Sequence, residues 1–395
     1  MEALVIAPQP FYSPRGTPFS VYYRTLVTSE HGVNIDLLTY GEGEDVDIPR
    51  VRIIRIPRFS FLGDVKIGPS YLKIFLDIFI FLWTIRLLAT KNYDFIHAHE
   101  ESVFFCRVLK PFFKFKLVYD MHSSLPQQLT NFKFTKSRIL INIFRKMEES
   151  CLQAADAIIT ICPDLENYVN GIIGGKKKHF LIENSIFDEI LFPSKFTNPC
   201  RDASKDTDAK IDLPLGKRFV LYAGTLEAYQ GLEILIKAFP FVHQENPEAI
   251  LLIVGGTKDQ VDHYRSLSRE CGIEKHVLFT GRVPKSVVQW YSRTASVLVS
   301  PRSAGTNTPL KIYEYLSSGK PIVATNIFSH TQVLNPDIAF LVSPDPEGLA
   351  RGIVEALKPD GKRSRVVLNA GRFYEENYSR EVYEGKIRKM LESLA

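Results

Sequence analysis

The order of the apolar segments predicts an α/β protein with two doubly wound, Rossmann-like domains. If the two domains face each other across a cleft, the ligand-binding motifs should cluster just after strands. Strand-like and helical patterns alternate along the chain, which is typical of parallel sheets with crossover helices. The alternation occurs twice, in two halves of similar length. The 395 residues also exceed what one typical core holds, and this favours two domains.

Short apolar segments predict the strands, and longer periodic segments predict the helices between them. In the first half, strands are expected at 4–8, 35–39, 94–99, 116–120 and 157–161, with helices notably at 69–91 and 135–153. In the second half, strands are expected at 219–223, 250–254, 277–280, 296–299 and 322–324.

A polar segment that contains Pro193 and Pro199 lies between the two series and is typical of a surface loop. We therefore expect an N-terminal domain over 1–190, a linker over 191–216 and a C-terminal domain over 217–378. The last residues, 379–395, predict a helix that can pack back on the N-terminal domain.

The composition narrows the class of protein. A net charge of +5 is modest and does not support nucleic-acid binding. The five cysteines lack C-x-x-C spacing, so we expect reduced thiols and neither a disulfide scaffold nor a zinc site. No signal peptide is visible, and the apolar stretch 78–85 is well short of the roughly 20 residues that span a bilayer. We expect a cytoplasmic protein that can also lie at the inner face of the cell membrane.

The most informative segment runs from Thr308 to Thr325 and predicts a capped helix followed by a buried strand. Thr308 is suited to the N-cap and Pro309 to the first helical position, whose N–H has no partner in any case. Gly319 fits the left-handed position that ends a helix, and Pro321 prevents the helix from continuing.

The start of this predicted helix is a candidate anion site. The amides of Leu310 and Lys311 would lack helical partners and could bind a phosphate. Glu314 lies about 4.5 Å further along the axis by helix rise, and its side chain tilts back toward the same end. A diphosphate with an adjoining ribose would match these groups. The alternative is an ordinary amphipathic helix with a surface Glu.

Other candidate residues follow predicted strands, where doubly wound domains bind ligands. After the first strand, Gly16 lets the backbone approach a ligand, Thr17 can cap a helix that starts at Pro18, and Arg15 could reach a phosphate. A plain turn with a solvated Arg is the alternative. In the second domain, 224–231 and 255–257 are glycine-containing turns, but neither is the GxGxxG of nicotinamide-binding proteins.

Three histidines also follow or end strands. His122 comes directly after the strand that ends in Asp120, so it should lie at the rim of a crevice, where it could contact a substrate oxygen. A structural role is the alternative. His97 and His99 should point to the same face of the sheet, but the sequence defines no third metal ligand.

The order of these segments resembles the family 4 retaining glycosyltransferases of the GT-B fold over nearly the whole chain. The matching segments are the opening strand and glycine loop, Asp120–His122, Glu183–Asn184, Gly224–Gly231, Gly281–Pro284 and Pro309–Thr325. The resemblance implies that Glu314 binds the ribose of a nucleotide sugar, and that the helix start, including Thr308, Leu310 and Lys311, binds the diphosphate. It implies further that His122 contacts the transferred sugar and that the turn containing Arg282 lies against the base.

Three positions depart from the family pattern. Thr306 stands where the family has an acid that contacts the sugar hydroxyls, and Thr225 and Gln230 stand where it has an Arg and a Lys for the diphosphate. Lys311, Arg302 or Arg15 could supply the missing positive charge.

The segment 107–146 carries nine basic residues against Asp120 alone, interleaved with phenylalanines. Basic residues among aromatic ones suit an anionic membrane surface. We expect peripheral membrane contact, with a solvated face over core aromatics as the alternative.

The resemblance thus implies a retaining glycosyltransferase that moves a sugar from a nucleotide-sugar donor to a lipid-linked or glycan acceptor, as in cell-envelope polysaccharide or glycoconjugate synthesis. No cofactor or metal is expected besides the nucleotide-sugar co-substrate. A GT-B epimerase acting on a nucleotide sugar, and a non-catalytic subunit that binds one, are the alternatives.

Overall fold

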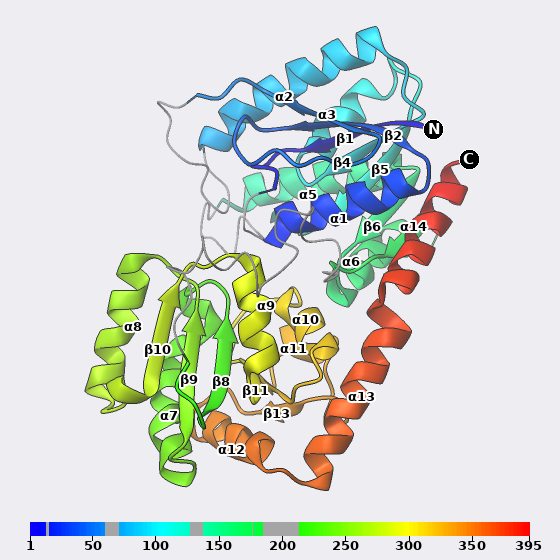
Figure 1. Cartoon of the computed structure of the whole chain (residues 1–395). Helices are drawn as coiled ribbons and strands as arrows, with labels where there is room; N and C mark the ends of the chain where they lie inside the picture. The colour runs from blue at the N-terminus through cyan, green and yellow to red at the C-terminus, as the bar shows by residue number, and fades with distance from the viewer. Residues whose placement is uncertain (13–15, 60–70, 127–136, 176, 185–212) are drawn as a thin grey trace. The chain divides into compact units, whose positions relative to one another are not determined.

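The computed structural model describes residues 1–12, 16–59, 71–126, 137–175, 177–184 and 213–395. It divides the chain into two compact units. Unit 1 comprises Met1–Ile186 and Arg380–Ala395, and unit 2 comprises Phe187–Ser379. Most of the predicted linker, 191–216, lies outside the described residues. The two units are drawn in Figure 1.

Unit 1 is built on a parallel sheet of seven strands in the order β3-β2-β1-β4-β5-β6-β7. The strands are β1 Glu2–Ala7, β2 Asn34–Thr39, β3 Val51–Arg55, β4 Phe95–His99, β5 Lys116–Met121, β6 Ala157–Thr160 and β7 Lys178–Leu181. The five strands predicted in this half are confirmed as β1, β2, β4, β5 and β6. The order reverses between β1 and β4, and doubly wound sheets bind ligands at such a switch point.

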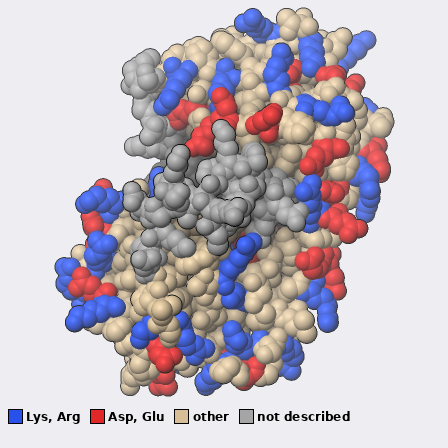
Figure 2. Space-filling view, viewed as in Figure 1, with Lys and Arg blue, Asp and Glu red and all other residues tan. Residues whose placement is uncertain are grey.

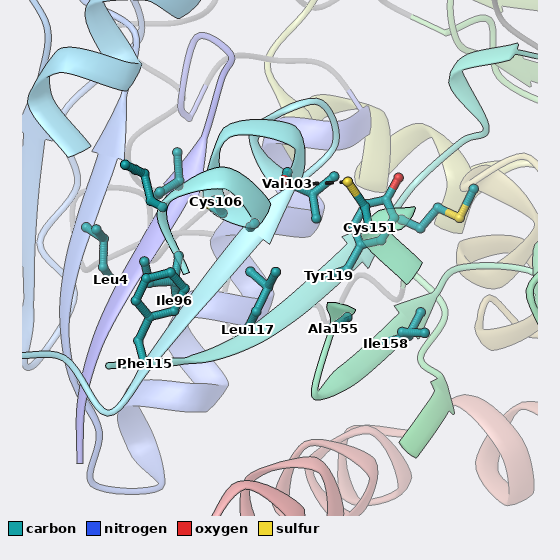
Figure 3. Packing of buried hydrophobic residues seen from close by; sticks show 14 of the residues in the cluster. Leu4, Ile96, Val103, Cys106, Phe115, Leu117, Tyr119, Cys151, Ala155 and Ile158 are labelled. Atoms are coloured by element: carbon teal, nitrogen blue, oxygen red, sulfur yellow. Dashed lines mark hydrogen bonds between the residues drawn. The ribbon is translucent and has the colours of Figure 1, made fainter. Parts of the chain in front are cut away.

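Two layers of helices cover this sheet. The helices of unit 1 include α1 Gly16–Glu30, α2 Tyr71–Thr90, α3 Ser102–Leu109, α5 Arg138–Ala154, α6 Pro163–Ile173 and α14 Arg380–Leu394. In one layer, α3 packs between α2 and α5. Apolar residues of these three helices and of α6 form one core with alternate residues of the central strands, for example Cys106 with Ile96 and Leu117. Figure 3 shows this packing, with Cys151 directed at the carbonyl of Val103.

The final helix, α14, belongs to unit 1, although unit 2 precedes it in sequence. It packs against α1, β6 and β7. Arg380 pairs with Glu30 of α1 at 2.9 Å, and Lys386 pairs with the buried Glu183. These contacts tie the end of the chain to the first domain.

Unit 2 is built on a second parallel sheet, in the order β10-β9-β8-β11-β12-β13. Its strands are β8 Arg218–Ala223, β9 Ala249–Val254, β10 Val277–Gly281, β11 Val297–Ser300, β12 Ile322–Thr325 and β13 Phe340–Val342. Its α-helices include α7 Leu232–Glu245, α8 Lys258–Glu270, α9 Lys285–Thr294, α10 Lys311–Ser317, α11 Phe328–Thr331, α12 Pro346–Leu357 and α13 Gly361–Tyr378. The five strands predicted in this half are confirmed, and the switch point falls between β8 and β11.

The predicted α/β class with two doubly wound domains is therefore confirmed. The strands that the sequence did not predict, β3, β7 and β13, each lie at the edge of a sheet. β3 and β7 carry basic residues among their apolar ones, and β13 has only three residues, so none of them shows the long apolar run that marks β1 or β9. Four cysteines, Cys106, Cys151, Cys162 and Cys271, are free thiols, and Cys200 lies outside the described residues. Within the described part of the chain, no helix is both long and apolar enough to cross a membrane.

Candidate functional site

The turn after β8 packs directly on the segment after β11, at the switch point of unit 2. Gly231 has a φ of 74°, and a Cβ at this position would lie 1.9 Å from the carbonyl oxygen of Pro301. The amide of Ser303 donates to the carbonyl of Tyr229 at 2.9 Å. Only glycine allows this approach, and the two segments therefore form one surface at the carboxyl ends of the strands.

The side chain of Lys311, the first residue of α10, reaches into this surface. Its Nζ lies 3.9 Å from the centre of the Tyr222 ring, and a Cβ on Gly224 would lie 2.8 Å from it. The atom is buried, and among the described residues it has no hydrogen-bond partner. Burial, followed by the charge of Arg302, lowers the pKa of Lys311 to about 7. A buried ammonium without a hydrogen-bond acceptor costs free energy, and binding of an anion beside it would offset this cost.

Arg302, whose charge acts on Lys311, is the second cation of this surface. It donates to the carbonyls of Ala304 and Asn307, and its guanidinium lies 5.2 Å from the centre of the Tyr229 ring. Burial lowers the pKa of Arg302 below its usual value. Within the described part of the chain, neither Arg302 nor Lys311 forms an ion pair. Two cations that interact electrostatically and have no acidic partner among the described residues favour binding of a dianionic group such as a diphosphate.

Thr225 and Gln230, which replace the basic residues of the family pattern, lie in the turn after β8. The amide nitrogen of Gln230 donates to the Thr225 hydroxyl at 3.5 Å. The amide oxygen of Gln230 is buried, with no partner among the described residues. The structure thus brings Thr225, Gln230, Arg302 and Lys311 to one switch point, and both cations come from the part of the chain that follows β11.

Glu314, one turn into α10, accepts a hydrogen bond from Lys285, the first residue of α9. Both side chains are largely buried, with exposed fractions of 23% and 18%. Tyr315 accepts from the amide of Ala223 at 3.4 Å and so anchors α10 against the end of β8. Sequence reasoning missed Lys285, although it directly follows the turn at 281–284 that was singled out.

The predicted start of α10 is wrong by two residues. The helix begins at Lys311, after a tight turn in which the amide of Ile312 donates to Pro309 and that of Tyr313 donates to Leu310. This 3₁₀-type start replaces the expected cap, so the hydroxyl of Thr308 is buried without a partner in the described part of the chain. Gly319 has a φ of 68°, which confirms the predicted end of the helix.

The remaining predicted donor residues are spread around this surface or lie elsewhere. Arg282 is exposed after Gly281, and the carbonyl of Thr306 accepts from Gln332. Gly16 belongs to unit 1, where it begins α1. Thr17 is therefore inside the first turn and is not the cap that the sequence predicted. Arg15 lies outside the described residues.

In unit 1, Asp120 is the centre of a buried polar cluster. Its side chain is fully buried and pairs with Arg24 of α1 at 2.8 Å, whose own side chain is 1% exposed. His97 contacts the same carboxylate oxygen at 2.8 Å. Burial opposes the charge of Asp120, but Arg24, His99 and His122 together hold its pKa well below the usual value. Arg24 also donates to the carbonyl of Ile182 and bonds with Tyr383 of α14, so the cluster joins three parts of the unit.

His122 is part of this cluster, directly after β5, and is 3% exposed; its place at the rim of a crevice stays a prediction. Its Nε2 lies 3.3 Å from Asp120 and 3.2 Å from His99. Burial, with a smaller effect of Arg24, lowers the pKa of His122 to about 4. The ring is therefore neutral near pH 7, so one of its nitrogens donates a hydrogen bond and the other accepts one.

His97 and His99 lie on the same face of the sheet as predicted, with stacked rings 4.6 Å apart. Asp120 supplies the third potential metal ligand that the sequence did not define, since the three groups lie within 4.8 Å of one another. However, Arg24 already pairs with the carboxylate. The guanidinium would repel a divalent cation at this position, so the donor set does not fit a metal site.

Two carboxyl side chains that the sequence did not single out, those of Asp77 and Glu100, lie at the same end of this sheet. Asp77 of α2 accepts from the hydroxyl of Tyr40 at 2.6 Å, and Glu100 accepts from Ser123 at 3.0 Å. Burial, followed by the charge of Glu101, raises the pKa of Asp77 and of Glu100 to about 8 in each case. These carboxyls are protonated near neutral pH and can act as hydrogen-bond donors.

Two Rossmann-like units on one chain, each with a doubly wound parallel sheet, are the architecture of the GT-B glycosyltransferases. The chain belongs to this class by family: the family model described as Glycosyl transferases group 1 matches residues 204–373, and that of Glycosyltransferase Family 4 matches residues 21–186. The protein is therefore a glycosyltransferase, which confirms the resemblance stated from the sequence.

Individual relatives agree with this assignment. An uncharacterised glycosyltransferase of Methanocaldococcus jannaschii is 24% identical over 90% of this chain and 87% of its own length. The phosphatidyl-myo-inositol mannosyltransferase of Mycobacterium tuberculosis is 29% identical over 47% of this chain and 50% of its own length.

Solved structures share the fold. Sucrose-phosphate synthase of Thermosynechococcus elongatus has a TM-score of 0.76 at 20% identity, covering 100% of this chain and 99% of that one. The Anabaena protein HepE, solved in complex with UDP-glucose, has a TM-score of 0.71 at 17% identity, covering 100% of both chains.

Proposed function

We propose that this glycosyltransferase takes its sugar from a nucleotide-sugar donor, and that unit 2 binds the donor at the switch point between β8 and β11. The observation that carries the proposal is the pair of cations, Lys311 and Arg302, which have no acidic partner among the described residues. The diphosphate of the donor would satisfy both charges. The UDP-glucose complex of HepE, a protein of the same fold, supports this type of donor.

In this proposal Glu314 binds the ribose of the nucleotide, as the family pattern implies. Lys285 holds its carboxylate in place before the donor arrives. Thr308, Leu310 and Gln230 contribute further polar contacts near the diphosphate, Thr225 lies beside Gln230, Arg282 lies near the base and Thr306 takes the place of the sugar-binding acid. Gly16, in unit 1, would allow a close approach of the backbone to the ligand.

The reaction would proceed with retention and without a metal. When the bond from the sugar to the diphosphate breaks, negative charge grows on the leaving oxygen, and Lys311 and Arg302 stabilise it electrostatically. The acceptor hydroxyl would attack from the face that the diphosphate leaves. His122 would hold the sugar through a hydrogen bond from its neutral ring, which Asp120 and His99 keep in a fixed orientation.

The proposed acceptor is lipid-linked or a glycan, in the synthesis of cell-envelope or other glycoconjugates, at the cytoplasmic side of a membrane. The relationship to an enzyme named a phosphatidyl-myo-inositol mannosyltransferase supports the lipid-linked form.

A thermal-shift screen of nucleotide sugars tests donor binding, because a specific ligand stabilises the folded state by mass action. The donor that binds is then incubated with and without candidate acceptors. The proposal is supported if the reaction releases nucleoside diphosphate and if the glycosidic bond of the product has the same anomeric configuration, α or β, as the sugar in the donor. Turnover that needs no acceptor and yields an epimer would overturn it, as would binding without any turnover across the acceptor panel.

A further inference from the structure

Exposed apolar side chains gather on one helical layer of unit 1. Sixteen large hydrophobic residues are exposed in the described part of the chain, and ten of them belong to α2, to α5, or to α3 and the turn after it. On α2 these residues are Ile74, Phe75, Ile78 and Leu82, and on α5 they are Ile139, Leu140, Ile143 and Met147. Val108 and Phe112, 58% and 79% exposed, lie between the two helices in sequence. We call these ten residues the apolar face.

The spacing of the residues shows that each helix presents a stripe. Both sets follow the pattern i, i+1, i+4, i+8, which spans an arc of about 100° on a helix with 3.6 residues per turn. The opposite side of α2 carries Leu76 and Ile80, which pack in the core. Because α3 packs against both α2 and α5, the outer sides of the three helices belong to one layer.

The charges on the same helices have one sign. Every exposed charged residue of α2, of α3, of the following segment 110–116 and of α5 is a Lys or Arg. They are Arg86, Lys114, Arg138, Arg145, Lys146 and Lys116, the last of which donates to carbonyls at the end of α14. The acidic residues of these helices are buried or half-buried, as with Glu148, which is bonded to Ser124 and Tyr168. In Figure 2, tan and blue atoms predominate at the upper margin, where Figure 1 places α2.

We propose that the apolar face docks onto an anionic lipid bilayer. Apolar stripes that enter the interface, with basic residues at their margins, are the chemistry of surface-binding helices. A second copy of the chain fits less well, because a symmetric contact through this face would bring identical cations together. The inference rests on the proposed lipid-linked acceptor, whose sugar-accepting end lies at such a surface.

This surface differs from the segment that the sequence predicted. The predicted segment 107–146 omits α2 altogether, and two of its cations are engaged within the fold. Lys110 pairs with Asp156 at 2.6 Å, and Lys116 donates to carbonyls at the end of α14. Its residues Phe132, Lys133, Phe134 and Lys136 lie outside the described residues.

Vesicle flotation of the full chain tests the inference. The probes are vesicles of phosphatidylcholine alone, and of phosphatidylcholine mixed with phosphatidylglycerol. We expect flotation with the mixed vesicles at low salt and at least a tenfold weaker association at high salt, since salt screens the basic residues. The double variant Ile139→Ser/Ile143→Ser and the double variant Arg145→Glu/Lys146→Glu should each lose most of this binding. The matched control is Phe241→Ser/Leu368→Ser, which removes two exposed apolar residues of unit 2 and should float like the unchanged protein.

The outcomes separate this inference from the proposed function. Donor binding by thermal shift, and transfer to a water-soluble acceptor, should be the same in all these variants. No flotation of the unchanged protein at low salt, or equal flotation of the α5 variants, would overturn the inference while leaving the transferase proposal intact. A dimer in solution that Ile139→Ser/Ile143→Ser dissociates would also overturn it, in favour of a second copy as the occupant.

Discussion

Lys311 holds its ammonium 3.9 Å from the centre of the Tyr222 ring, with no hydrogen-bond acceptor among the described residues. A buried cation of this kind lowers the stability of the unliganded protein, because it loses hydration without a compensating partner. A bound anion would supply the missing partner and remove this loss of stability. The contact between Lys311 and Tyr222 therefore links the stability of unit 2 to the binding of its ligand.

Replacement of Lys311 by Met should separate binding from stability. The substitution keeps the length of the side chain and removes the charge, so we expect nucleotide-sugar affinity to fall about 10- to 100-fold, the value of a charge-assisted hydrogen bond. The melting temperature without ligand should stay the same or rise. Calorimetric titration and thermal unfolding measure the two effects. Lys320→Met, at a half-buried lysine of the same unit, is the control, and equal affinity in both variants would exclude a role for Lys311.

Donor binding should take up protons near neutral pH. Burial and Arg302 lower the pKa of Lys311 to about 7, and a bound diphosphate would raise it again because negative charge favours the ammonium. Affinity should therefore fall as the pH rises from about 7 toward 10. The stability of the unliganded protein should change in the opposite sense: a lowered lysine pKa reduces stability as the pH falls from 10.5 through 7. Titrations in two buffers of different ionisation enthalpy measure the proton uptake, and identical heats in both would contradict it.

Gly231→Ala should damage both the fold and the site. A methyl group there would lie 1.9 Å from the Pro301 carbonyl, at a φ of 74°. We expect a loss of about 2 kcal/mol or more in the free energy of unfolding, from the clash and the backbone strain together. Urea unfolding measures the loss. Gly361→Ala, where an added Cβ meets nothing within 4 Å, should cost little, and a similar loss in both variants would show that the contact with Pro301 is unimportant.

Glu100→Gln should stabilise unit 1 only at higher pH. The pKa of Glu100 is raised from 4.5 to about 8, so the folded state keeps a proton that the unfolded state loses, and stability falls as the pH rises between these values. The uncharged amide of the Gln variant does not titrate, so this loss of stability at higher pH disappears. We expect a gain of about 1 kcal/mol or more above pH 8 and almost none near pH 4.5. Thermal unfolding across this range tests it, with the exposed Glu381→Gln as a variant that should show no such trend.

The central strands and the end of α10 could be predicted from the sequence because their signals are local. Continuous apolar runs mark β1 and β9, and Gly319 before Pro321 marks the end of the helix. The start of α10 has a weaker signal, since Thr308 and Pro309 suit both a capped helix and the 3₁₀-type turn that forms. The edge strand β3 carries Arg52 and Arg55 among only three apolar residues, and it was missed for that reason.

The site could be predicted only in part. Residues were correctly placed after strands, and Lys311 was named as a source of positive charge. Its enclosure by Tyr222 depends on packing between α10 and β8, which no local pattern shows. The same holds for Arg24 and Asp120, which are 96 residues apart in the chain and meet only in the folded unit. Buried ion pairs across such separations leave no spacing rule in the sequence.

A crystal structure of the protein with its bound nucleotide sugar is the most direct test of donor binding at Lys311. We expect a diphosphate oxygen about 2.7–2.9 Å from Lys311 Nζ, the length of a charge-assisted hydrogen bond, with the ribose hydroxyls at Glu314. A diphosphate bound elsewhere, with Lys311 still without an acceptor against Tyr222, would contradict it.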